Sequence, residues 1–270
     1  RLPMRIATWN VNSIKMRANA VRDWLAADNA DVLCLQEIKC ETDAFPADLF
    51  AEIGFESAVL GQKSYNGVAL LSRLGLEDVR LGLPGNAADE QARYVEALVQ
   101  GVRIGCLYLP NGNPADDPVK YPYKLEWMQR LHDHALSLMA GGGPVVLAGD
   151  YNVIPTEDDC WDLQEWVDDA LYLLPTRQAF RRLVYLGLTD AFRAIHLNLS
   201  SAYSFWDYQK GRWHRGEGIR IDHLMLSPSA ADRLIDAGID KEPRGKEKAS
   251  DHTPAWCELA DAPPRPLLTP

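Results

Sequence analysis

Two short polar side chains, Asp150 and Asn152, follow an apolar run and are placed where chemistry could be done. Residues 145–148 are apolar throughout, as expected for a strand packed on both faces, and Gly149 follows them. Because alternate residues of an extended chain point the same way, both polar side chains can share one face. The carboxyl ends of core strands are where α/β proteins tend to hold reacting groups. A turn-forming pair that merely closes the strand is the competing interpretation.

Similar polar side chains end or follow other predicted strands. Asn10 and Asn12 follow a strand predicted over 5–9, and Glu37 closes an apolar strand predicted over 31–37. Strands are also predicted over 67–72, 93–100, 102–109 and 220–227, and a last one follows residue 254. The remaining members of the set are Tyr108, Asn111, Asp222, Asp251 and His252. Any one of these residues, taken singly, could serve only the fold. The occurrence of the whole set at strand ends indicates a reaction centre.

Oxygen ligands dominate this set, which contains a single histidine. Carboxylate and amide oxygens suit Mg²⁺ or Mn²⁺ far better than zinc. Cleavage of a phosphodiester needs a metal to neutralise charge, a base for the attacking water, and donors for the phosphate oxygens. The sequence therefore predicts metal-assisted phosphodiester hydrolysis, with Mg²⁺ as the cofactor and Mn²⁺ as a substitute.

The elements that must position these residues can be read from periodicity. An amphipathic helix is predicted over 124–139, and residues 141–144 end it; a further helix begins at 175–176. The predicted strands exceed what one sheet holds comfortably, so two packed sheets with helices outside are expected. No linker interrupts the composition, which predicts a single catalytic domain over 4–260 and a Pro-rich tail over 261–270.

Composition narrows the class of protein. The chain has 270 residues, 47% of them hydrophobic and 24% charged, and no apolar run approaches the ~20 residues that a membrane span needs. The five cysteines form no Cys-x-x-Cys pair, so neither a disulfide framework nor a zinc site is expected and a cytoplasmic location fits. The net charge of −10 argues against bulk electrostatic binding of nucleic acid. Screening over about 8 Å still allows a local basic patch to act.

One such patch mixes aromatic and cationic side chains. Its members are Phe205, Trp206, Tyr208, Lys210, Arg212, Trp213 and Arg215. Aromatic rings can wedge into a base gap or pack on a deoxyribose, while lysine and arginine bind phosphates. The segment is therefore predicted to bind DNA, and the competing interpretation is a solvated loop above a core aromatic.

The motifs together resemble the exonuclease III family of bacterial AP endonucleases. They occur in that family's order: Trp9-Asn10-Val11-Asn12, Leu35-Gln36-Glu37, Tyr108-x-Pro-Asn111, Gly149-Asp150-Tyr151-Asn152, Phe205-Trp206-x-Tyr208, Arg220-Ile221-Asp222 and Ser250-Asp251-His252-Thr253-Pro254. The resemblance spans nearly the whole chain, from about residue 4 to 258. It implies an α/β fold of the DNase I-like kind, a four-layered sandwich with two mixed sheets inside and helices outside.

The resemblance also implies roles for the site residues. Glu37 would be the principal metal ligand, with Asn10, Asn12 and Asp251 around the ion. Asp150, with Asn152 beside it, would position or deprotonate the attacking water or protonate the leaving oxygen. His252, oriented by Asp222, would contact the scissile phosphate, as would Tyr108 and Asn111. Asp150, Asn152 and His252 also count among the candidate metal ligands. Which group is the base stays open.

One departure from the family is visible after the first motif. Many members read Gly-Leu-Arg there, whereas this chain has Ser13, Ile14 and Lys15. Lys15 keeps the positive charge without the guanidinium fork, which places its expected phosphate contact in question.

The expected function is DNA repair: cleavage of duplex DNA 5′ to abasic sites, and removal of 3′ blocking groups or nucleotides in the 3′→5′ direction, by a monomer without a membrane partner. Two alternatives remain. One is a small-molecule or lipid phosphodiesterase on the same fold, which would have little use for the basic and aromatic segment. The other is a catalytically inactive nucleic-acid-binding homologue, against which the intact Glu37, Asp150, Asp222 and His252 argue.

Overall fold

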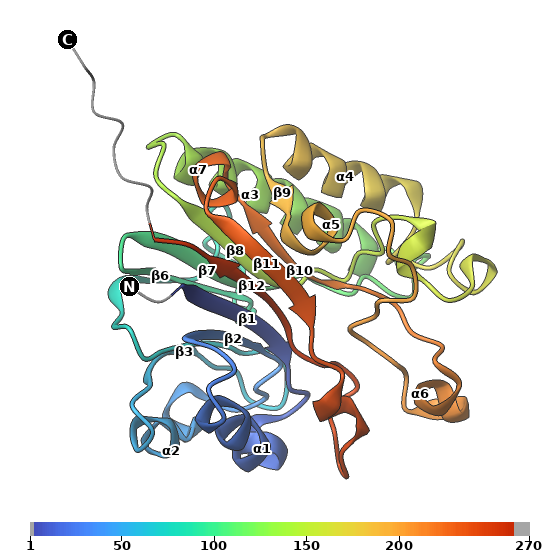
Figure 1. The fold of residues 1–270 in the computed structure, drawn as a ribbon. Helices are drawn as coiled ribbons and strands as arrows, with labels where there is room; N and C mark the ends of the chain where they lie inside the picture. The colour runs from blue at the N-terminus through green and yellow to red at the C-terminus, as the bar shows by residue number, and fades with distance from the viewer. Residues whose placement is uncertain (1–2, 262–270) are drawn as a thin grey trace.

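The computed structural model describes residues 3–261, whose strands form two six-stranded sheets packed face to face (Figure 1). The first sheet runs, in spatial order, β11 (Leu234–Ile239), β12 (Ala255–Leu259), β1 (Met4–Asn10), β2 (Val32–Gln36), β4 (Val68–Ser72) and β3 (Glu56–Leu60). The second runs β5 (Glu77–Leu81), β6 (Tyr94–Val99), β7 (Val102–Tyr108), β8 (Val145–Asp150), β10 (Asp222–Leu226) and β9 (Thr189–Asp190). Each sheet is mixed, because β1 pairs with β2, and β7 with β8, in parallel while β12 and β10 add antiparallel neighbours.

Helices cover the outer faces of both sheets. The helices α1 (Ile14–Ala26) and α2 (Ala47–Ala51) lie on the first sheet, and α3 (Lys120–Met139) and α4 (Leu174–Tyr185) lie on the second. The shorter helices are α5 (Ala191–Ile195), α6 (Arg212–Arg215) and α7 (Pro228–Ala231), and the 3₁₀ turns are η1 (Thr42–Ala44), η2 (Glu157–Asp159), η3 (Leu163–Glu165), η4 (Gln209–Gly211) and η5 (Glu242–Gly245). The expected four-layered α/β sandwich is confirmed.

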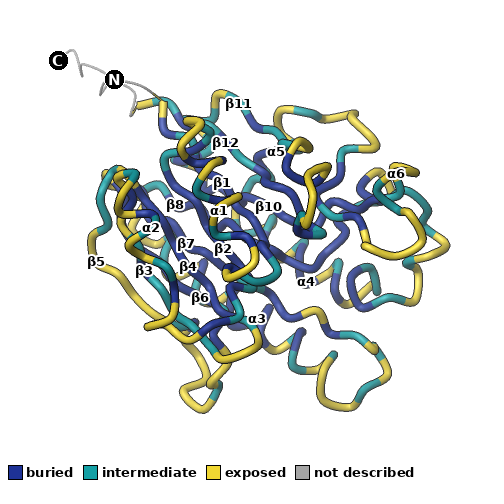
Figure 2. Tube along the Cα trace, turned by 90° about the horizontal axis from the view of Figure 1, so that it is seen from below, coloured by how far each residue is buried: buried dark blue, intermediate teal, exposed yellow. Residues whose placement is uncertain are grey.

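The apolar strands are buried on both faces, as their sequences predict. Within β2, Cys34 packs between the two sheets, whereas its neighbour Leu35 packs beneath α1. This division follows from the period of two along a strand, because successive side chains enter different cores. Figure 2 shows the resulting pattern, with buried strands at the centre and exposed residues concentrated on loops and outer helices.

The strand register of the second sheet aligns three polar residues. Asp150 is the cross-strand partner of Tyr108 on β7 and of Asp222 on β10. Gly149, just before this row, permits the close approach of the two strands, since a Cβ atom there would collide with the carbonyl oxygen of Leu107. A glycine in a strand interior therefore serves backbone packing at this point.

The sequence predictions for individual elements differ from the structure mainly at the ends. The helix expected from residue 124 begins at Lys120, because Pro122 lies in the first turn, where backbone N–H groups have no intrahelical acceptor in any case. The strands β3, β5, β9 and β11 were not predicted, and the proposed tail falls mostly on residues 262–270, which lie outside the described residues.

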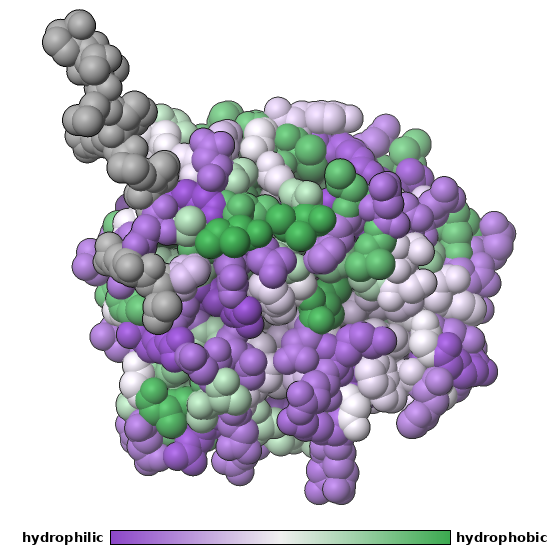
Figure 3. Space-filling model, in the orientation of Figure 1, coloured by the Kyte–Doolittle hydropathy of each residue, from purple (hydrophilic) through white to green (hydrophobic). Residues whose placement is uncertain are grey.

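The face of the molecule drawn in Figure 3 is mostly hydrophilic, with apolar side chains gathered in smaller groups. None of the helices that the structure describes is long and apolar enough to cross a membrane.

Candidate active site

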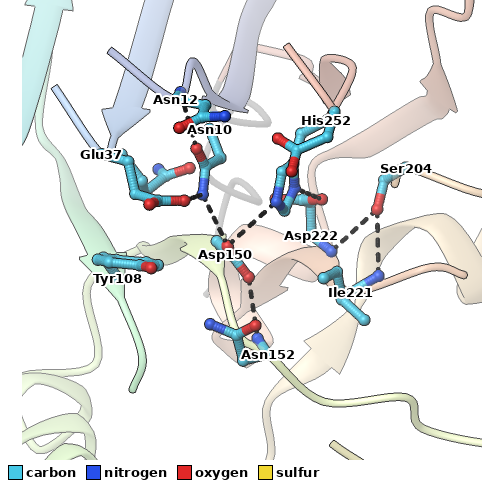
Figure 4. A network of polar contacts seen from close by, with 12 residues as sticks. Asn10, Asn12, Glu37, Tyr108, Asp150, Asn152, Ser204, Ile221, Asp222 and His252 are labelled. Atoms are coloured by element: carbon cyan, nitrogen blue, oxygen red, sulfur yellow. Dashed lines mark hydrogen bonds and ion pairs between the residues drawn. The ribbon is translucent and has the colours of Figure 1, made fainter. Parts of the chain in front are cut away.

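The polar strand ends meet at one edge of the sandwich, and both sheets contribute (Figure 4). The first sheet provides Asn10 at the end of β1 and Glu37 just after β2. The second provides the row of Tyr108, Asp150 and Asp222. The parallel pairing of β1 with β2 places Asn10 beside Gln36, one residue before Glu37, so the topology itself brings these groups together.

His252, in the segment before β12, bridges two carboxylates. Its Nδ1 lies 2.8 Å from Oδ2 of Asp222, and its Nε2 lies 3.5 Å from Oδ2 of Asp150. All three side chains are buried. Burial alone would lower the pKa of His252, but the carboxylates of Asp222 and Asp150 outweigh it and raise this pKa to about 10. The imidazole is therefore a cation that donates hydrogen bonds at neutral pH.

Asp150 occupies the centre of the site. Its Oδ2 accepts a hydrogen bond from Nδ2 of Asn10 at 2.9 Å, and its Oδ1 accepts one from the backbone N–H of Asn152 at 3.0 Å. Burial raises the pKa of Asp150 to about 7, even though the positive charge of His252 acts in the opposite direction. A carboxyl group with such a pKa can exchange a proton near neutrality.

Glu37 has a left-handed backbone, with φ of 52°, which a residue with a side chain adopts only at a cost in energy. Two hydrogen bonds hold the segment: N–H of Ser13 donates to the carbonyl of Glu37 at 2.8 Å, and N–H of Ile14 to that of Ile38 at 3.1 Å. The carboxylate also accepts a hydrogen bond from Nδ2 of Asn10. Asn10 thus links the carboxylates of Glu37 and Asp150 across the two sheets.

The donor set fits a divalent cation. One ligand atom from each of Glu37, Asp150 and His252 lies within 4.8 Å of the other two. Because both ring nitrogens of His252 face carboxylates, the imidazolium serves as a donor in this arrangement, and the oxygens of Glu37 and Asp150 are the better ligands. Glu37 remains 20% exposed, so water or a substrate oxygen can reach it. Hard oxygen ligands with open positions suit Mg²⁺.

Asn12 and Asp251 do not join that group. The side-chain oxygen of Asn12 accepts a hydrogen bond from Nζ of Lys39 at 2.5 Å, and its Nδ2 donates to the hydroxyl of Tyr208 at 3.3 Å. Its amide oxygen therefore shares the ammonium of Lys39 with Glu37, whose Oε1 lies 3.7 Å from that nitrogen, and the role of Asn12 as a metal ligand stays a prediction. Asp251 accepts from Oγ of Ser250 at 3.4 Å, and burial raises its pKa, with a smaller contribution from Glu37.

The other side of the site is formed by Tyr108, Asn111 and Asn152. Burial raises the pKa of Tyr108 well above its usual value, and the nearby carboxylates of Glu37 and Asp150 add to this, so its hydroxyl stays protonated. The Nδ2 atom of Asn111 lies 3.4 Å from Oδ1 of Asn152. Asn152 also donates from Nδ2 to the carbonyl of Leu109 at 2.8 Å. The two amides therefore form one polar wall beside Asp150.

The aromatic residues of the 205–215 segment have different environments. Trp206 is only 1% exposed and packs at 4.9 Å, ring centre to ring centre, against Trp213. The packed ring presents no face to a ligand in this conformation, and direct contact of Trp206 with DNA stays a prediction. Tyr208 is 50% exposed, and the ring of Phe205 lies 5.0 Å from that of His252. These two rings border the site.

The cations of the same segment are largely neutralised within the protein. Arg212 forms ion pairs with Glu217 at 2.6 Å and Glu165 at 3.3 Å, and Arg215 pairs with Glu217 at 2.6 Å. Lys210 is exposed, and none of the described carboxylates forms an ion pair with it. Lys15, at the start of α1, is also exposed. Glu217 lies only two residues after Arg215, so the sequence offered this acid as a partner, whereas Glu165 reaches Arg212 only through the fold.

Sequence reasoning missed several supporting residues. Arg17 donates to the carbonyls of Lys248 at 3.2 Å and Ala249 at 3.3 Å, and also to that of Asn12, so it ties two site loops together. Oγ of Ser204 accepts hydrogen bonds from the N–H groups of Ile221 and Asp222, both at 3.1 Å (Figure 4). The only sequence signal for the role of Ser204 is its position directly before the Phe205-Trp206 motif. Arg17 lies after the Trp9-Asn10-Val11-Asn12 motif but does not belong to it, so no motif marks it.

Comparison with known proteins agrees with this geometry. The model of the Endonuclease/Exonuclease/phosphatase family matches residues 7–252. Exodeoxyribonuclease III of Haemophilus influenzae is 29% identical over 267 residues, covering 95% of this chain and all (100%) of that protein. The 3′ phosphatase NExo from Neisseria, bound to product DNA hairpin, has a TM-score of 0.92 with 39% identity, covering 95% of this chain and 99% of the other.

An AP endonuclease from Archaeoglobus fulgidus is equally similar over its length, with a TM-score of 0.90, 36% identity, and coverage of 95% of this chain and 99% of the other. The matched region contains every strand end that forms the carboxylate and imidazole cluster. The chain belongs to the endonuclease/exonuclease/phosphatase family, and within it to the exonuclease III and AP endonuclease group.

Proposed function

We propose that this protein is a DNA-repair phosphodiesterase that cleaves duplex DNA 5′ to abasic sites and removes 3′ blocking groups or nucleotides in the 3′→5′ direction. The observation that carries the proposal is that the buried imidazole of His252 lies between the carboxylates of Asp150 and Asp222, close to Glu37. The names of the similar proteins, an exodeoxyribonuclease, a 3′ phosphatase and an AP endonuclease, support a nuclease acting on DNA.

Mg²⁺ is the proposed cofactor, with Mn²⁺ as its substitute. Glu37 and Asp150 would hold the ion, with amide oxygens near them. When bound, the ion would neutralise charge on the phosphate and polarise the bond to be broken. Asn10 contacts the carboxylates of both Glu37 and Asp150, and it would keep the two at a fixed spacing when a bound cation neutralises their charge.

The proton chemistry is assigned to Asp150 and His252. His252, a cation whose pKa is raised to about 10, would donate a hydrogen bond to a non-bridging phosphate oxygen while Asp222 fixes its ring. Asp150, whose pKa burial raises to about 7, would take the proton of the attacking water or return one to the leaving oxygen. The protonated hydroxyl of Tyr108 and the amides of Asn111 and Asn152 would bind the remaining oxygens.

The DNA would lie across the edge that contains Tyr208, Phe205 and the exposed ammonium groups of Lys15 and Lys210. A cavity of about 220 Å³ lies beside Phe205, between Trp161 and Trp166 and next to Arg212. Phe205, whose ring lies 5.0 Å from that of His252, connects this cavity with the site. Its aromatic lining would suit a sugar drawn out of the duplex, whereas the carboxylates of the lining, Glu165, Asp169, Asp207 and Glu217, would disfavour a phosphate. We further propose that one domain over 4–260 acts as a monomer in the cytoplasm.

The alternatives have less support. A small-molecule or lipid phosphodiesterase would share the metal cluster, but the similar proteins are DNA enzymes. A catalytically inactive DNA-binding protein would have no need of a buried imidazolium between two carboxylates, because buried charges are costly to maintain.

A 5′-labelled duplex with one abasic analogue, incubated with the enzyme and Mg²⁺, tests the proposal. A single nick 5′ to the lesion indicates AP endonuclease activity, and a ladder from the 3′ end indicates exonuclease activity. An intact strand in the presence of either Mg²⁺ or Mn²⁺ would refute the proposed function. A parallel reaction with bis(p-nitrophenyl) phosphate measures any activity on small phosphodiesters.

A further inference from the structure

A fully buried lysine lies directly beneath the amide wall of the site. Lys124 of α3 is 0% exposed, and its Nζ donates to the backbone carbonyls of Asn111 at 3.0 Å and Asn152 at 2.6 Å. None of the described carboxylates forms an ion pair with it. Burial lowers the pKa of Lys124 to about 7, and the more distant charges of Asp169 and Asp150 only partly oppose this. A buried ammonium without an acid is expensive, so its presence calls for a specific reason.

The two acceptors belong to loops that are far apart in sequence. The Asn111 loop follows β7, whereas Asn152 follows β8 and has a left-handed backbone with φ of 47°. A buried carbonyl needs a donor, and here one ammonium group satisfies both carbonyls at once. The same two residues meet in front through their side chains, with Nδ2 of Asn111 lying 3.4 Å from Oδ1 of Asn152. Lys124 thus joins the two loops through their backbone carbonyls, while the side-chain amides of Asn111 and Asn152 contact each other directly.

The stem of the lysine shapes the first loop as well. Gly112 has φ of +86°, and a Cβ atom there would lie only 2.7 Å from Cδ of Lys124. The backbone of the loop therefore rests directly on the lysine methylenes. The next residue, Asn113, is anchored separately by Nδ2 to Asp169 at 3.0 Å. Removing the lysine would free the loop at Asn111 while leaving this second anchor in place.

We propose that Lys124 is a positioning residue that holds the amides of Asn111 and Asn152 at the spacing required to bind one phosphate. The inference rests on the proposed phosphodiesterase function. It assigns to Lys124 no contact with the substrate: its effect passes through the two asparagine backbones. Misplacement of donors by about 1 Å can lower a rate by about 100-fold, so the loss of such a clamp would be measurable.

The competing explanation is that any buried cation of α3 merely stabilises the fold. Arg130 of the same helix provides the matched control. It is also buried and bonds to backbone carbonyls, those of Leu83 at 2.8 Å and Pro84 at 3.2 Å, and to Asp89 at 2.8 Å. None of its partners belongs to the site. A variant of Arg130 should therefore lower stability without altering how Asn111 works.

A double-mutant cycle separates the two explanations. The kcat and KM values for an abasic-analogue duplex with Mg²⁺ are measured for wild type, Lys124→Met, Asn111→Ala and the double variant, and again with Arg130→Met in place of Lys124→Met. We expect Lys124→Met to lower kcat/KM by about 10- to 100-fold. Combined with Asn111→Ala, it should lower kcat/KM by clearly less than the product of the two single effects, since part of the effect of Lys124 passes through Asn111 and the rest through Asn152. The effects of Arg130→Met and Asn111→Ala on kcat/KM should simply multiply, because Arg130 contacts no residue of the site.

Lys124→Arg keeps a positive charge and N–H donors on a different and bulkier head group, and should recover part of the loss. Multiplicative effects of Lys124→Met and Asn111→Ala, or a Lys124→Met enzyme within threefold of wild type, would overturn the inference. If Lys124→Met does not fold, the cycle is run with Lys124→Gln, under the same criterion. A wild-type enzyme that leaves the abasic duplex intact refutes the proposed function itself, whereas an active wild type with a multiplicative cycle refutes only the role of Lys124.

Discussion

Asp150 and Asp222 are direct cross-strand partners on β8 and β10, so two carboxyl groups face the same end of the second sheet. Like charges placed opposite each other in a sheet are destabilising unless a cation is shared between them. His252 supplies that cation, with its two ring nitrogens directed at the two carboxylates. The position of this histidine thus depends on both sheets being packed together.

Replacement of Asp150 or His252 should impair chemistry more than binding. Asp150→Asn keeps the shape but cannot take up a proton, and His252→Asn keeps a donor but removes the cation. We expect each variant to bind abasic duplex within several-fold of wild type and to cleave it at least about 100-fold more slowly. Asp222→Asn should be milder, since it acts through His252. Single-turnover rates, with gel-shift affinities in Ca²⁺, separate the two effects. An Asp150→Asn enzyme with a normal single-turnover rate would contradict its assignment.

Activity should depend on a divalent metal held chiefly by Glu37. Chelation should abolish cleavage, and Mg²⁺ or Mn²⁺ should restore it, because hard oxygen ligands dominate the cluster. Glu37→Gln should raise the Mg²⁺ concentration needed for half-maximal activity. Glu41→Gln, a nearby substitution at an exposed position, is the control. Equal Mg²⁺ dependence of the Glu37→Gln and wild-type enzymes would be incompatible with this role.

The salt dependence of DNA binding should distinguish the cations of the 205–215 segment. Lys210→Ala should reduce the slope of log K against log salt by about 0.9, the value for one phosphate contact. Arg212→Ala and Arg215→Ala should change it less, because Glu217 already neutralises both side chains. Glu217→Gln provides the opposite test and should increase the slope. Equal slopes for wild type, Lys210→Ala and Glu217→Gln would show that this segment faces away from DNA.

Ser13→Gly should stabilise the protein. Ser13 has φ of 90° and ψ of 111°, a conformation that favours glycine, and its side chain forms no capping hydrogen bond for α1. Glycine should relieve about 1–3 kcal/mol of backbone strain at this position. This gain should exceed the roughly 0.5–1 kcal/mol that glycine typically costs because it gives the unfolded chain more conformational freedom. The free energy of unfolding in urea is the measurement. Ser13→Ala, which keeps the Cβ atom, should be nearly neutral, so a gain for Ala equal to that for Gly would argue against backbone strain.

The buried Asp190–Arg220 pair should contribute to stability in a pH-dependent way. Burial raises the pKa of Asp190, but the charge of Arg220, 2.8 Å from its Oδ2, outweighs burial and lowers this pKa to about 2. A depressed pKa stabilises the fold above the ordinary value near 3.8, and the contribution is lost as the pH falls towards 2. It amounts to about 2 kcal/mol.

Unfolding in urea at several pH values checks this. The difference in unfolding free energy between wild type and Asp190→Asn should be constant from pH 7 to 5 and shrink below pH 4. Asp232→Asn, at an exposed position, should show no such convergence. A wild-type advantage that persists unchanged at pH 3 would contradict the assigned pKa.

Much of the fold follows from patterns that the sequence shows directly. The buried strand β8 was predicted because four consecutive apolar residues precede Gly149, and β2 because residues 32–35 form a similar apolar run before Gln36 and Glu37. The edge strand β5 was missed because all its residues are exposed, so no alternation of apolar and polar side chains marks it. Strand ends could be predicted as the location of the site because parallel neighbours bring their carboxyl ends together.

Orientation and pairing could not be predicted. Asn12 lies where the motif predicts, but its amide oxygen accepts a hydrogen bond from Lys39, which also pairs with Glu37. Arg212 and Arg215 look like phosphate ligands in sequence, and only the folded chain shows that Glu217 already binds both. Lys124 was expected simply as the first residue of an amphipathic helix, and its role depends on carbonyls that the sequence does not mark.

The first sheet is assembled from both ends of the chain, since β1 to β4 come from residues 4–72 and β11 and β12 from 234–259, while the second sheet comes from 77–226. During translation β1 is made before every strand of the second sheet, whereas its neighbour β12 is made after all of them. Until then one edge of β1 is unpaired, and the indole of Trp9 lacks the carbonyl of His252 to which it donates at 3.3 Å. A chain made only as far as Asp222 has Glu37, Asp150 and Asp222 but no imidazolium between the last two, so we expect it to cleave no DNA.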